Sequence, residues 1–571
     1  MKLFKAAGIL LMTIGLAANA QEANKFFPEK DLMTAGIYYY PEHWDPSQWA
    51  RDIKQISLMG FEFVHLAEFA WAQLEPEEGK FNFGWLDKVI ELCATNNLKV
   101  LMCTPSAATP AWMHNKYPET FIMYGNYIRA EHGTRGLGSI VNPVYRQFIE
   151  RIVTEMAKRY GQNESVLLDF ASFTSYPNVG QHNIGDQGFR LGNHRPLSFA
   201  NDYYRNITGV TGIMELQPGP VNWGSVTPLL LPGAVRMWLW HCFGAGSSFA
   251  CSYRFRQILY GAEQYFAGII KTDGVTPSAG GEEYMQFIRE LKELRKLYKP
   301  DSKMPENLAS RKSAILWNHE NFWSIDRQAQ TQQWDAWGYP GKFQEILKSF
   351  GAPVDIVGET TDLSQYNFVI VPAYELIDSA LVKKWADYAT NGGNLVITCR
   401  TGTKDRNGHF WEAEIAAPVT GLIGARILAT DMLPSDVTGE IFYKSAIYNW
   451  NNWADLLLPD TGTEVLAAYI NQFYNGKAAV VKHIVGKGTV TYIDVDTADS
   501  KLEKDILREI FHQAGVTTED YPQGVYAYWR DGFFIAVNYT SSNYTVVIPA
   551  NAKILIGEKV LKPAGVVVWK E

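Results

Sequence analysis

Residues 212–223 hold the clearest candidate for chemistry, because an apolar run ends there in Glu215 and is followed by a Pro-Gly-Pro break and Trp223. In barrels of alternating strands and helices, catalytic side chains stand at the carboxyl ends of strands, and Glu215 has that placement. A carboxylate of this kind can attack the anomeric carbon of a sugar while an aromatic ring supports the sugar. A surface acid in a turn fits these residues equally well, so the rest of the chain must decide.

Sugar cleavage with retention of configuration needs a second carboxyl group, placed about 5 to 5.5 Å from the first. That group protonates the departing oxygen and then activates water, so it must stay protonated near neutral pH. Glu164 follows Asn163 just after a predicted helix that ends at Gly161, and an acid there enters the next strand from the wrong end of the barrel. We therefore do not assign Glu164 as the proton donor, and the sequence identifies no other acid/base.

Motifs for other chemistries are absent from the sequence. It contains no GxSxG or GxCxG elbow, no P-loop, no HExxH pair and no GxGxxG turn after a strand. The five cysteines form no CxxC pair and lie among apolar residues, which indicates buried free thiols rather than a disulfide framework. We therefore expect neither a metal nor a cofactor.

Length and composition indicate a globular protein of several domains, with 571 residues of which 47% are hydrophobic and 20% are charged. Residues 1–20 are typical of a secretory signal, with Lys2 and Lys5 before an apolar middle and Ala18-Asn19-Ala20 as the cleavage site. Removing them takes the net charge from −8 to −10, which argues against nucleic-acid binding. We expect export, most simply to a periplasm, and no membrane span after signal removal.

The elements that must position Glu215 alternate between strands and helices over the first part of the chain. Strands are predicted at residues 33–40, 61–69, 99–104, 166–176, 210–216 and 248–255. Helices are predicted at residues 45–60, 85–94, 142–161, 198–205, 232–243 and 282–297. This alternation predicts a parallel sheet with helical crossovers, but it supplies six strand–helix units where a closed barrel has eight.

Two further domains follow a barrel domain at residues 21–300. Residues 309–515 are predicted to form an open, doubly wound α/β domain, with strands at 313–317, 354–357, 368–371, 394–399 and 489–494. This domain carries no nucleotide or nucleophile motif, so we interpret it as structural or assembling. Residues 520–571 contain short alternating runs that predict a small antiparallel β-domain.

Six motifs, in order along the barrel domain, resemble glycoside hydrolase family 42, the β-galactosidases. They are YYPEHW at residues 39–44, FAWAQLEPEEG at 69–79, TPSAATPAW at 104–112, NPVYR at 142–146, MELQPG at 214–219, and RFRQ at 254–257 with EQ at 263–264. The three-part layout is also similar to the family, so the resemblance covers nearly the whole chain. It implies a (β/α)8-type barrel, a flavodoxin-like trimerisation domain and a homotrimer.

The resemblance implies roles for individual residues of this chain. Glu215 would be the nucleophile that forms the glycosyl-enzyme. Trp223 and Tyr176 would line the galactose site, and Glu263 would bind sugar hydroxyls. Arg135 would match an arginine near the nucleophile.

The sequence departs from the family at two places. Phe266 stands where the family usually has a histidine, and its side chain cannot donate a hydrogen bond to a sugar hydroxyl. In the family, a helix ending in Arg-Tyr-Gly precedes a strand ending in Asn-Glu, the acid/base, whereas here residues 159–166 run directly into a segment that resembles the sixth strand. The fourth and fifth strands and their helices are therefore expected to be absent. Such a barrel could close with fewer strands, borrow from a neighbour or fail to fold, or the gene model could be truncated.

We predict an exported retaining β-galactosidase that acts on terminal, non-reducing β-D-galactosyl residues of oligosaccharides or glycans. Its activity is expected to be reduced, because the acid/base segment is missing. A non-catalytic galactoside-binding or relict protein is the alternative, and a carboxyl group within reach of Glu215 would discriminate between the two. An α-L-arabinopyranosidase is a third reading, because that sugar shares most of the stereochemistry of galactose.

Overall fold

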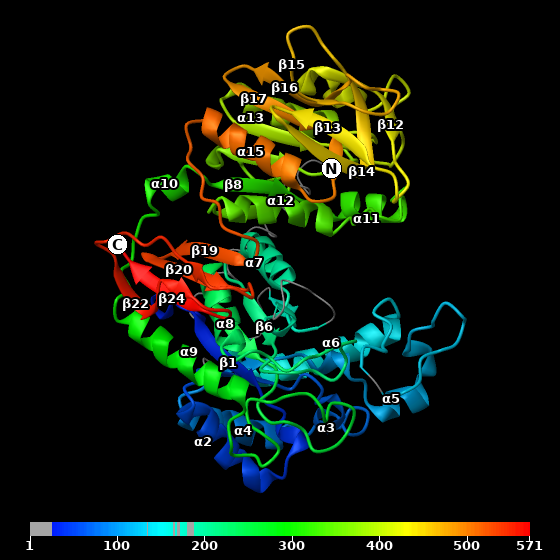
Figure 1. Cartoon of the computed structure of the whole chain (residues 1–571). Coiled ribbons are helices and arrows are strands. Elements are labelled where there is room, and N and C mark those ends of the chain that lie inside the picture. Colours follow the sequence, from blue (N-terminus) through cyan, green and yellow to red (C-terminus); the bar gives the residue numbers. More distant parts are fainter. Residues whose placement is uncertain (1–25, 134, 164–165, 168–171, 180–187) are drawn as a thin grey trace. The chain divides into compact units, whose positions relative to one another are not determined.

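The computed structural model of the chain describes residues 26–133, 135–163, 166–167, 172–179 and 188–571 (Figure 1). The predicted signal at residues 1–20 and Glu164 lie outside the described residues. The chain divides into two compact units. The first combines Met1–Ser302 with Arg530–Glu571, and the second is Lys303–Trp529.

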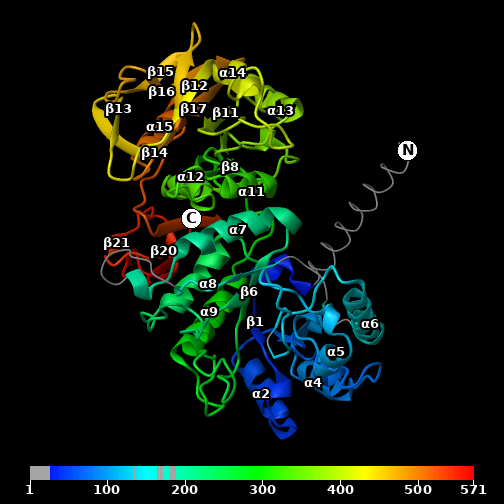
Figure 2. The ribbon, with the colours of Figure 1, turned by 90° about the vertical axis from the view of Figure 1, so that its right-hand side faces the viewer.

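The first unit contains a seven-stranded sheet in the order β4-β3-β2-β1-β7-β6-β5, and its strand pairs are parallel. The strands are β1 (Thr34–Tyr38), β2 (Phe63–Leu66), β3 (Lys99–Met102), β4 (Val166–Leu167), β5 (Phe173–Ser175), β6 (Gly212–Leu216) and β7 (Phe249–Ser252). The helices are α2 (Trp49–Leu58), α3 (Trp71–Leu74), α4 (Gly84–Thr95), α5 (Ala111–Lys116), α6 (Pro143–Tyr160), α7 (His194–Thr208), α8 (Ala234–Gly244) and α9 (Ala279–Arg295). In Figure 2, α8 and α9 run side by side along the sheet. The predicted barrel-like α/β arrangement is thus confirmed.

Local sequence signals set the starts of these helices. Asp45 accepts a hydrogen bond from the Ser47 amide at 2.9 Å and so caps the turn that leads into α2. Asn142 accepts hydrogen bonds from the amides of Val144 and Tyr145 at 2.9 and 3.1 Å, which caps α6. Both caps lie where the sequence predicts helix starts.

Aromatic side chains fill the interior of the sheet. Gly36 of β1 makes room for the ring of Phe63, because a Cβ atom at position 36 would lie 2.0 Å from a ring carbon. Phe27 stacks on Phe249 of β7 with ring centroids 4.6 Å apart. Strands buried on both faces in this way consist of continuous apolar runs rather than alternating ones, which is why they are recognisable in the sequence.

The segment predicted as one strand at residues 166–176 contains two separate strands, β4 and β5. β4 pairs with β3, and β5 pairs with β6, so the two lie at opposite ends of the strand order. Residues 168–171 between them lie outside the described part of the chain. The predicted count of six strands is therefore wrong by one, because a single short apolar run contributes to both edges of the sheet.

The C-terminal part of the first unit is antiparallel, as predicted. Its strands are β20 (Phe533–Asn538), β21 (Tyr544–Thr545), β22 (Lys553–Gly557), β23 (Val560–Leu561) and β24 (Val566–Lys570), with β24 between β20 and β22. The Tyr539 hydroxyl lies 2.9 Å from Nδ1 of His241 on α8, and Arg530 donates to the carbonyl of Phe243 at 2.9 Å. These buried polar contacts fix the small sheet against α8.

The second unit is built on an eleven-stranded mixed sheet in which β17, β11, β10, β8 and β9 form the parallel part. The strands are β8 (Ser313–Leu316), β9 (Val354–Val357), β10 (Phe368–Val371), β11 (Asn394–Thr398), β12 (Ala425–Asp431), β13 (Gly439–Tyr443), β14 (Ala446–Pro459), β15 (Glu464–Tyr469), β16 (Ala478–Val485), β17 (Gly488–Ile493) and β18 (Val495–Thr497). The helices are α10 (Glu306–Ala309), α11 (His319–Arg327), α12 (Gly338–Ser349), α13 (Ser379–Thr390), α14 (Ala417–Ile423) and α15 (Lys501–Gln513), and β19 (Val525–Arg530) follows them.

The antiparallel part of this sheet, residues 425–485, is missing from the sequence-based prediction. β14 alone is 14 residues long and pairs with β12, β13 and β18. Its signal is a hairpin in which Tyr443 pairs with Ala446 across a two-residue turn. A doubly wound α/β domain therefore describes only the parallel half of the unit.

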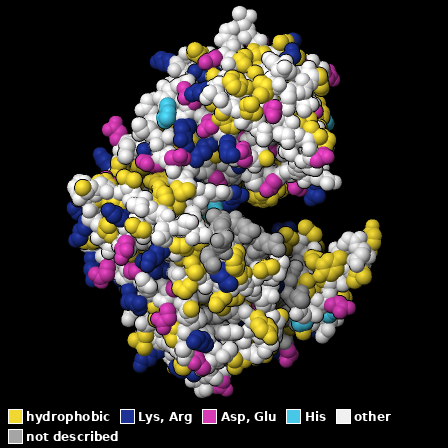
Figure 3. Space-filling model, viewed as in Figure 1, with side chains coloured by type: hydrophobic (Ala, Val, Ile, Leu, Met, Phe, Trp, Pro, Cys, Tyr) yellow, Lys and Arg dark blue, Asp and Glu magenta, His cyan; other side chains and the backbone are white. Residues whose placement is uncertain are grey.

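The visible surface carries positive and negative side chains that are interspersed rather than separated (Figure 3). This distribution agrees with the modest formal net charge of −8. Within the residues that the structure describes, no helix is both long and apolar enough to cross a membrane.

Candidate active site

Glu215 is the fourth residue of β6 and lies one residue before the end of that strand. Tyr176 follows β5 directly, and its hydroxyl donates a hydrogen bond of 2.5 Å to Oε2 of Glu215. Burial raises the pKa of Glu215, whereas the hydrogen bond from Tyr176 and the charge of Arg135 lower it. Two neighbouring strands thus bring the predicted nucleophile and a predicted galactose-site residue together.

Trp223 and Phe266 complete the wall beside Tyr176. The rings of Tyr176 and Trp223 meet edge to face with centroids 5.0 Å apart, and Trp223 is 53% exposed. Phe266 is buried and packs edge to face against Tyr176 at 5.9 Å and against Tyr253 at 4.8 Å. Phe266 is therefore a packing residue of the wall, and the exposed face of Trp223 is available to a sugar ring.

Glu263 is held by two donors from the segment after β7. The Tyr253 hydroxyl donates to its Oε2 at 2.6 Å, and the Arg254 guanidinium donates to the same oxygen at 2.8 Å. Nδ1 of His43 lies 3.0 Å from the other end of that guanidinium. Burial and the charge of Arg254 lower the pKa of His43 to about 4, so His43 is neutral at pH 7 and can accept this hydrogen bond.

Glu68 stands just past the end of β2 and was not singled out in the sequence. The Tyr40 hydroxyl donates to its Oε2 at 2.6 Å, and the ring of Tyr40 stacks on Phe69 with centroids 5.6 Å apart. Burial raises the pKa of Glu68 to about 7; the negative charge of Glu215 adds to this rise, and Tyr40 and Arg135 oppose it. The site therefore contains, besides Glu215, the carboxyl group of Glu68 with a pKa of about 7.

Glu42 is a fourth carboxyl group in this region. Both of its carboxyl oxygens are buried and have no hydrogen-bond partner in the structure. Burial raises its pKa to about 7, while the charge of Arg254 lowers it. The lack of solvent contact places Glu42 behind the surface that a substrate could reach.

Arg135 supplies positive charge to the site from an exposed loop. Its guanidinium lies over the ring of Phe69 at 5.5 Å. Burial lowers its pKa, but the charges of Glu68 and Glu215 raise it by more, so the net shift is upward. One site thus contains five of the predicted residues, namely Glu215, Tyr176, Trp223, Glu263 and Arg135. Glu164 lies outside the described residues.

Groups of side chains able to hold a metal ion are not found among the described residues. The four carboxyl groups of the site are instead tied to tyrosines and arginines or sealed from solvent. An arrangement of carboxylates, phenols and a guanidinium fits acid/base and nucleophilic chemistry on a neutral polar substrate.

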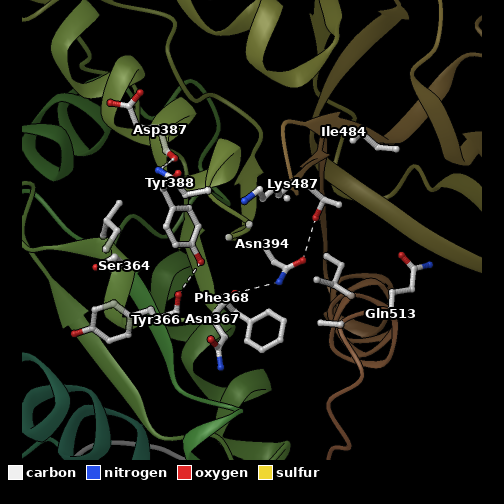
Figure 4. Close-up of a pocket in the computed structure, with 18 of the residues that line it drawn as sticks. Ser364, Tyr366, Asn367, Phe368, Asp387, Tyr388, Asn394, Ile484, Lys487 and Gln513 are labelled. Atoms are coloured by element: carbon white, nitrogen blue, oxygen red, sulfur yellow. Dashed lines mark hydrogen bonds between the residues drawn. The ribbon is translucent and has the colours of Figure 1, made fainter.

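A groove of about 1210 Å³ in the second unit is a less suitable site (Figure 4). Phe368, Asn394 and Thr489 line it from the amino ends of parallel strands, whereas ligands of open α/β sheets bind at the carboxyl ends. The amide group of Asn394 is already hydrogen-bonded: its Nδ2 donates to the Asn367 carbonyl at 3.2 Å, and its Oδ1 accepts from the Thr489 hydroxyl at 3.1 Å (Figure 4). Lys383 of this groove is paired with Asp387 at 2.6 Å, so the charge of Lys383 is already compensated.

Several site residues lie in motifs that the sequence analysis recognised without assigning a role. Glu42 and His43 belong to YYPEHW, Arg254 belongs to RFRQ, and Glu68 directly precedes FAWAQLEPEEG. Glu42 and His43 follow the predicted strand at residues 33–40, and Glu68 and Arg254 lie one residue before the ends of the predicted strands at 61–69 and 248–255. A place at the end of a strand is the signal that could have found them. The identity of their partners follows only from the order of the strands in the sheet.

Comparison with known families gives matches along most of the chain. Residues 38–168 and 166–294 match a model described as beta-galactosidase, residues 311–517 match a beta-galactosidase trimerisation domain, and residues 529–571 match a beta-galactosidase C-terminal domain. The first model is matched in two segments that meet at residues 166–168.

Comparison with individual proteins gives the same picture. The chain is 27% identical to the beta-galactosidase BgaH of Haloferax lucentense, over 92% of this chain and 96% of that protein. It is 24% identical to a beta-galactosidase of Thermus thermophilus, over 94% of this chain and 100% of that protein. The solved structure of a beta-galactosidase from Halorubrum lacusprofundi superimposes with a TM-score of 0.85 and 25% identity, covering 94% of this chain and 99% of that one.

Proposed function

The chain belongs to glycoside hydrolase family 42, the β-galactosidases, and we propose that it is a retaining enzyme for terminal, non-reducing β-D-galactosyl residues of oligosaccharides or glycans. The observation that carries this proposal is the Glu215 carboxylate at the end of β6, which accepts the Tyr176 hydrogen bond beside the exposed face of Trp223. Glu263 and Arg135 offer an acceptor and a donor for sugar hydroxyls at the same site.

The geometry supports a two-step displacement. An oxygen of the Glu215 carboxylate attacks the anomeric carbon, and the bond from that carbon to the departing oxygen breaks as the galactosyl ester forms. Tyr176 holds Glu215 in one orientation by its hydrogen bond, which positions the carboxylate for the attack. Water then hydrolyses the ester and releases galactose with its original configuration.

The finer part of the proposal is that the family's acid/base segment is absent and that activity is thereby reduced. The two matched segments meet at residues 166–168, and β4 and β5 lie at opposite ends of the strand order. The alignment with the Haloferax lucentense protein spans 655 positions, more than the 571 residues of this chain, so that protein contains residues without a counterpart here. These observations support a deletion at residues 166–168.

The test of the function is an intact-mass measurement after mixing the protein with dinitrophenyl β-galactoside. This leaving group departs without a proton, so the nucleophile alone can react. We expect one added galactosyl unit on the peptide that contains Glu215 and no addition in the Glu215→Gln variant. A protein that melts cooperatively but neither gains this mass nor releases dinitrophenol would refute the enzymatic proposal and favour a non-catalytic binding protein.

Assembly and location complete the proposal. Because residues 311–517 match a trimerisation domain, we propose a homotrimer, and static light scattering that gives the mass of a monomer would contradict it. The signal-like residues 1–20 support export to a periplasm. N-terminal sequencing of the protein recovered from the producing cells should begin at Gln21 if the segment is removed.

A further inference from the structure

We propose that Glu68 is the proton donor and general base that works opposite Glu215, an inference that rests on the proposed β-galactosidase function. The family's own acid/base segment supplies no described residue to the site. Glu68 would take over its task from a different strand. The case depends on position, contacts and the elimination of the other carboxyl groups.

The first argument is position. Glu68 follows the carboxyl end of β2, and Glu215 stands at the carboxyl end of β6. In the sheet β1 and β7 separate these two strands. Because all four strands are parallel, both carboxyl groups lie at the same edge of the sheet, where the strands end. Tyr38 at the end of β1 lies close to both, because the charges of Glu215 and Glu68 each raise its pKa in addition to the larger effect of burial.

The second argument is the protonation state. A general acid must hold its proton at neutral pH while the nucleophile beside it is ionised. Burial and the nearby charge of Glu215 raise the pKa of Glu68 to about 7. Tyr40 orients the carboxyl group through its hydrogen bond of 2.6 Å to Oε2; this bond lowers the pKa, but the effect of burial outweighs it.

The remaining carboxyl groups fit the task less well. Glu263 accepts hydrogen bonds from the guanidinium of Arg254 and from Tyr253, which favours an ionised acceptor over a proton donor. Glu42 has the required pKa of about 7, but both of its oxygens are sealed from solvent. Glu68 is only partly buried, so a departing sugar oxygen can reach it.

The reaction balances with these two residues. As Glu215 attacks the anomeric carbon, the glycosidic bond breaks and the Glu68 carboxyl proton moves to the departing oxygen, which leaves as an alcohol. The Glu68 carboxylate then removes a proton from water, the water oxygen bonds to the anomeric carbon, and the bond to Glu215 breaks. Galactose is released, and both carboxyl groups return to their starting states.

The test compares Glu68→Gln with the wild-type protein on dinitrophenyl β-galactoside and on an alkyl β-galactoside. We expect the variant to lose roughly 10²–10⁴-fold in kcat/KM on the alkyl substrate, which needs a proton. On the dinitrophenyl substrate we expect a burst of dinitrophenol, lower kcat and lower KM, because the first step proceeds and hydrolysis is slowed. Azide should restore turnover of the variant and give the β-galactosyl azide, since azide replaces water without needing a base.

Glu62→Gln is the matched control, because Glu62 precedes the same strand at its opposite end and pairs with Arg295 there. It should leave the rates on both substrates unchanged, and melting temperatures should show that both variants fold. Equal losses on the two substrates in Glu68→Gln, or no effect of azide, would overturn the role of Glu68. A wild-type enzyme that cleaves only the dinitrophenyl substrate would overturn it as well.

The same experiments separate this inference from the proposed function. If wild type and Glu68→Gln both gain a galactosyl unit on Glu215 but show equal alkyl rates, the function stands and the role of Glu68 is wrong. If neither gains it, the proposed function itself fails. Loss of the alkyl rate in Glu42→Gln but not in Glu68→Gln would transfer the role to Glu42.

Discussion

The hydroxyl of Tyr176 donates a 2.5 Å hydrogen bond to the carboxylate of Glu215, a residue 39 positions later in the chain. The two residues belong to the ends of β5 and β6, which are neighbouring parallel strands. This contact orients the nucleophile and stabilises its charge, which burial would otherwise disfavour. The strand pairing is thus directly connected to the chemistry.

Tyr176→Phe should lower kcat on dinitrophenyl β-galactoside by about 10- to 100-fold. The variant removes a hydrogen bond to a charged group, which is worth about 1.5–3 kcal/mol. Tyr117→Phe is the matched control, because the Tyr117 hydroxyl also donates to a glutamate, Glu78, at 3.0 Å. An unchanged kcat in Tyr176→Phe would show that the contact does not assist the reaction.

Trp223→Ala should raise KM by about 2- to 10-fold with little change in kcat. The exposed indole supports the sugar in substrate and transition state alike, and aromatic contacts of this kind are worth about 0.5–1.5 kcal/mol. Steady-state kinetics on one galactoside provide the measurement. Trp323→Ala removes an equally exposed tryptophan of the second unit and should leave KM unchanged.

Stability should decrease as the pH rises from about 5 to about 8. Glu42 and Glu68 have a pKa of about 7 in the folded protein against 4.5 in the unfolded chain, so the unfolded chain releases these protons first. The stabilisation is present below the unfolded pKa and is lost as the pH passes through 7. Calorimetry at both pH values should show the decline, and Glu42→Gln should reduce it. A variant with the wild-type decline would show that Glu42 is not protonated in the fold.

Glu375→Ala should destabilise the second unit by about 3–5 kcal/mol. The Glu375 carboxylate accepts hydrogen bonds from Arg400 and Lys404, both at 2.7 Å, and all three side chains are buried. Removing it leaves two buried positive charges without their partner. Lys383→Ala breaks the exposed pair with Asp387 and should change stability by less than about 1 kcal/mol. Denaturant titrations of both variants would compare the two effects, and a similar small loss in each would contradict the prediction.

Much of the fold could be read from residue patterns. Buried parallel strands such as β1 and β10 are continuous apolar runs, and helices such as α6 carry clear caps at Asn142. The antiparallel strands β12–β16 were not predicted. β12 and β13 expose alternate residues and β16 is buried only in its first half, so these strands do not form continuous apolar runs like the parallel strands. The short run that contains β4 and β5 could not be divided into two strands from the sequence. An apolar run does not indicate which neighbouring strand each half pairs with.

The candidate site was predictable in part. Glu215, Tyr176 and Trp223 carry strong local signals, and the structure brings them together. Glu68 and Glu42 were not chosen, because an acid after a strand is common in sequences and only its surroundings give it a raised pKa.

The sequence by itself determined the order of the domains and the family, and it predicted Glu215 as the nucleophile, because these depend on local motifs and on the periodicity of buried residues. Only the tertiary structure decided which carboxyl groups share the site and which one keeps a proton. Glu68 and Glu215 are far apart in the chain but influence each other electrostatically, because parallel strands place their carboxyl ends on one side of the sheet. Their pKa values depend on burial and neighbouring charge, which exist only after folding.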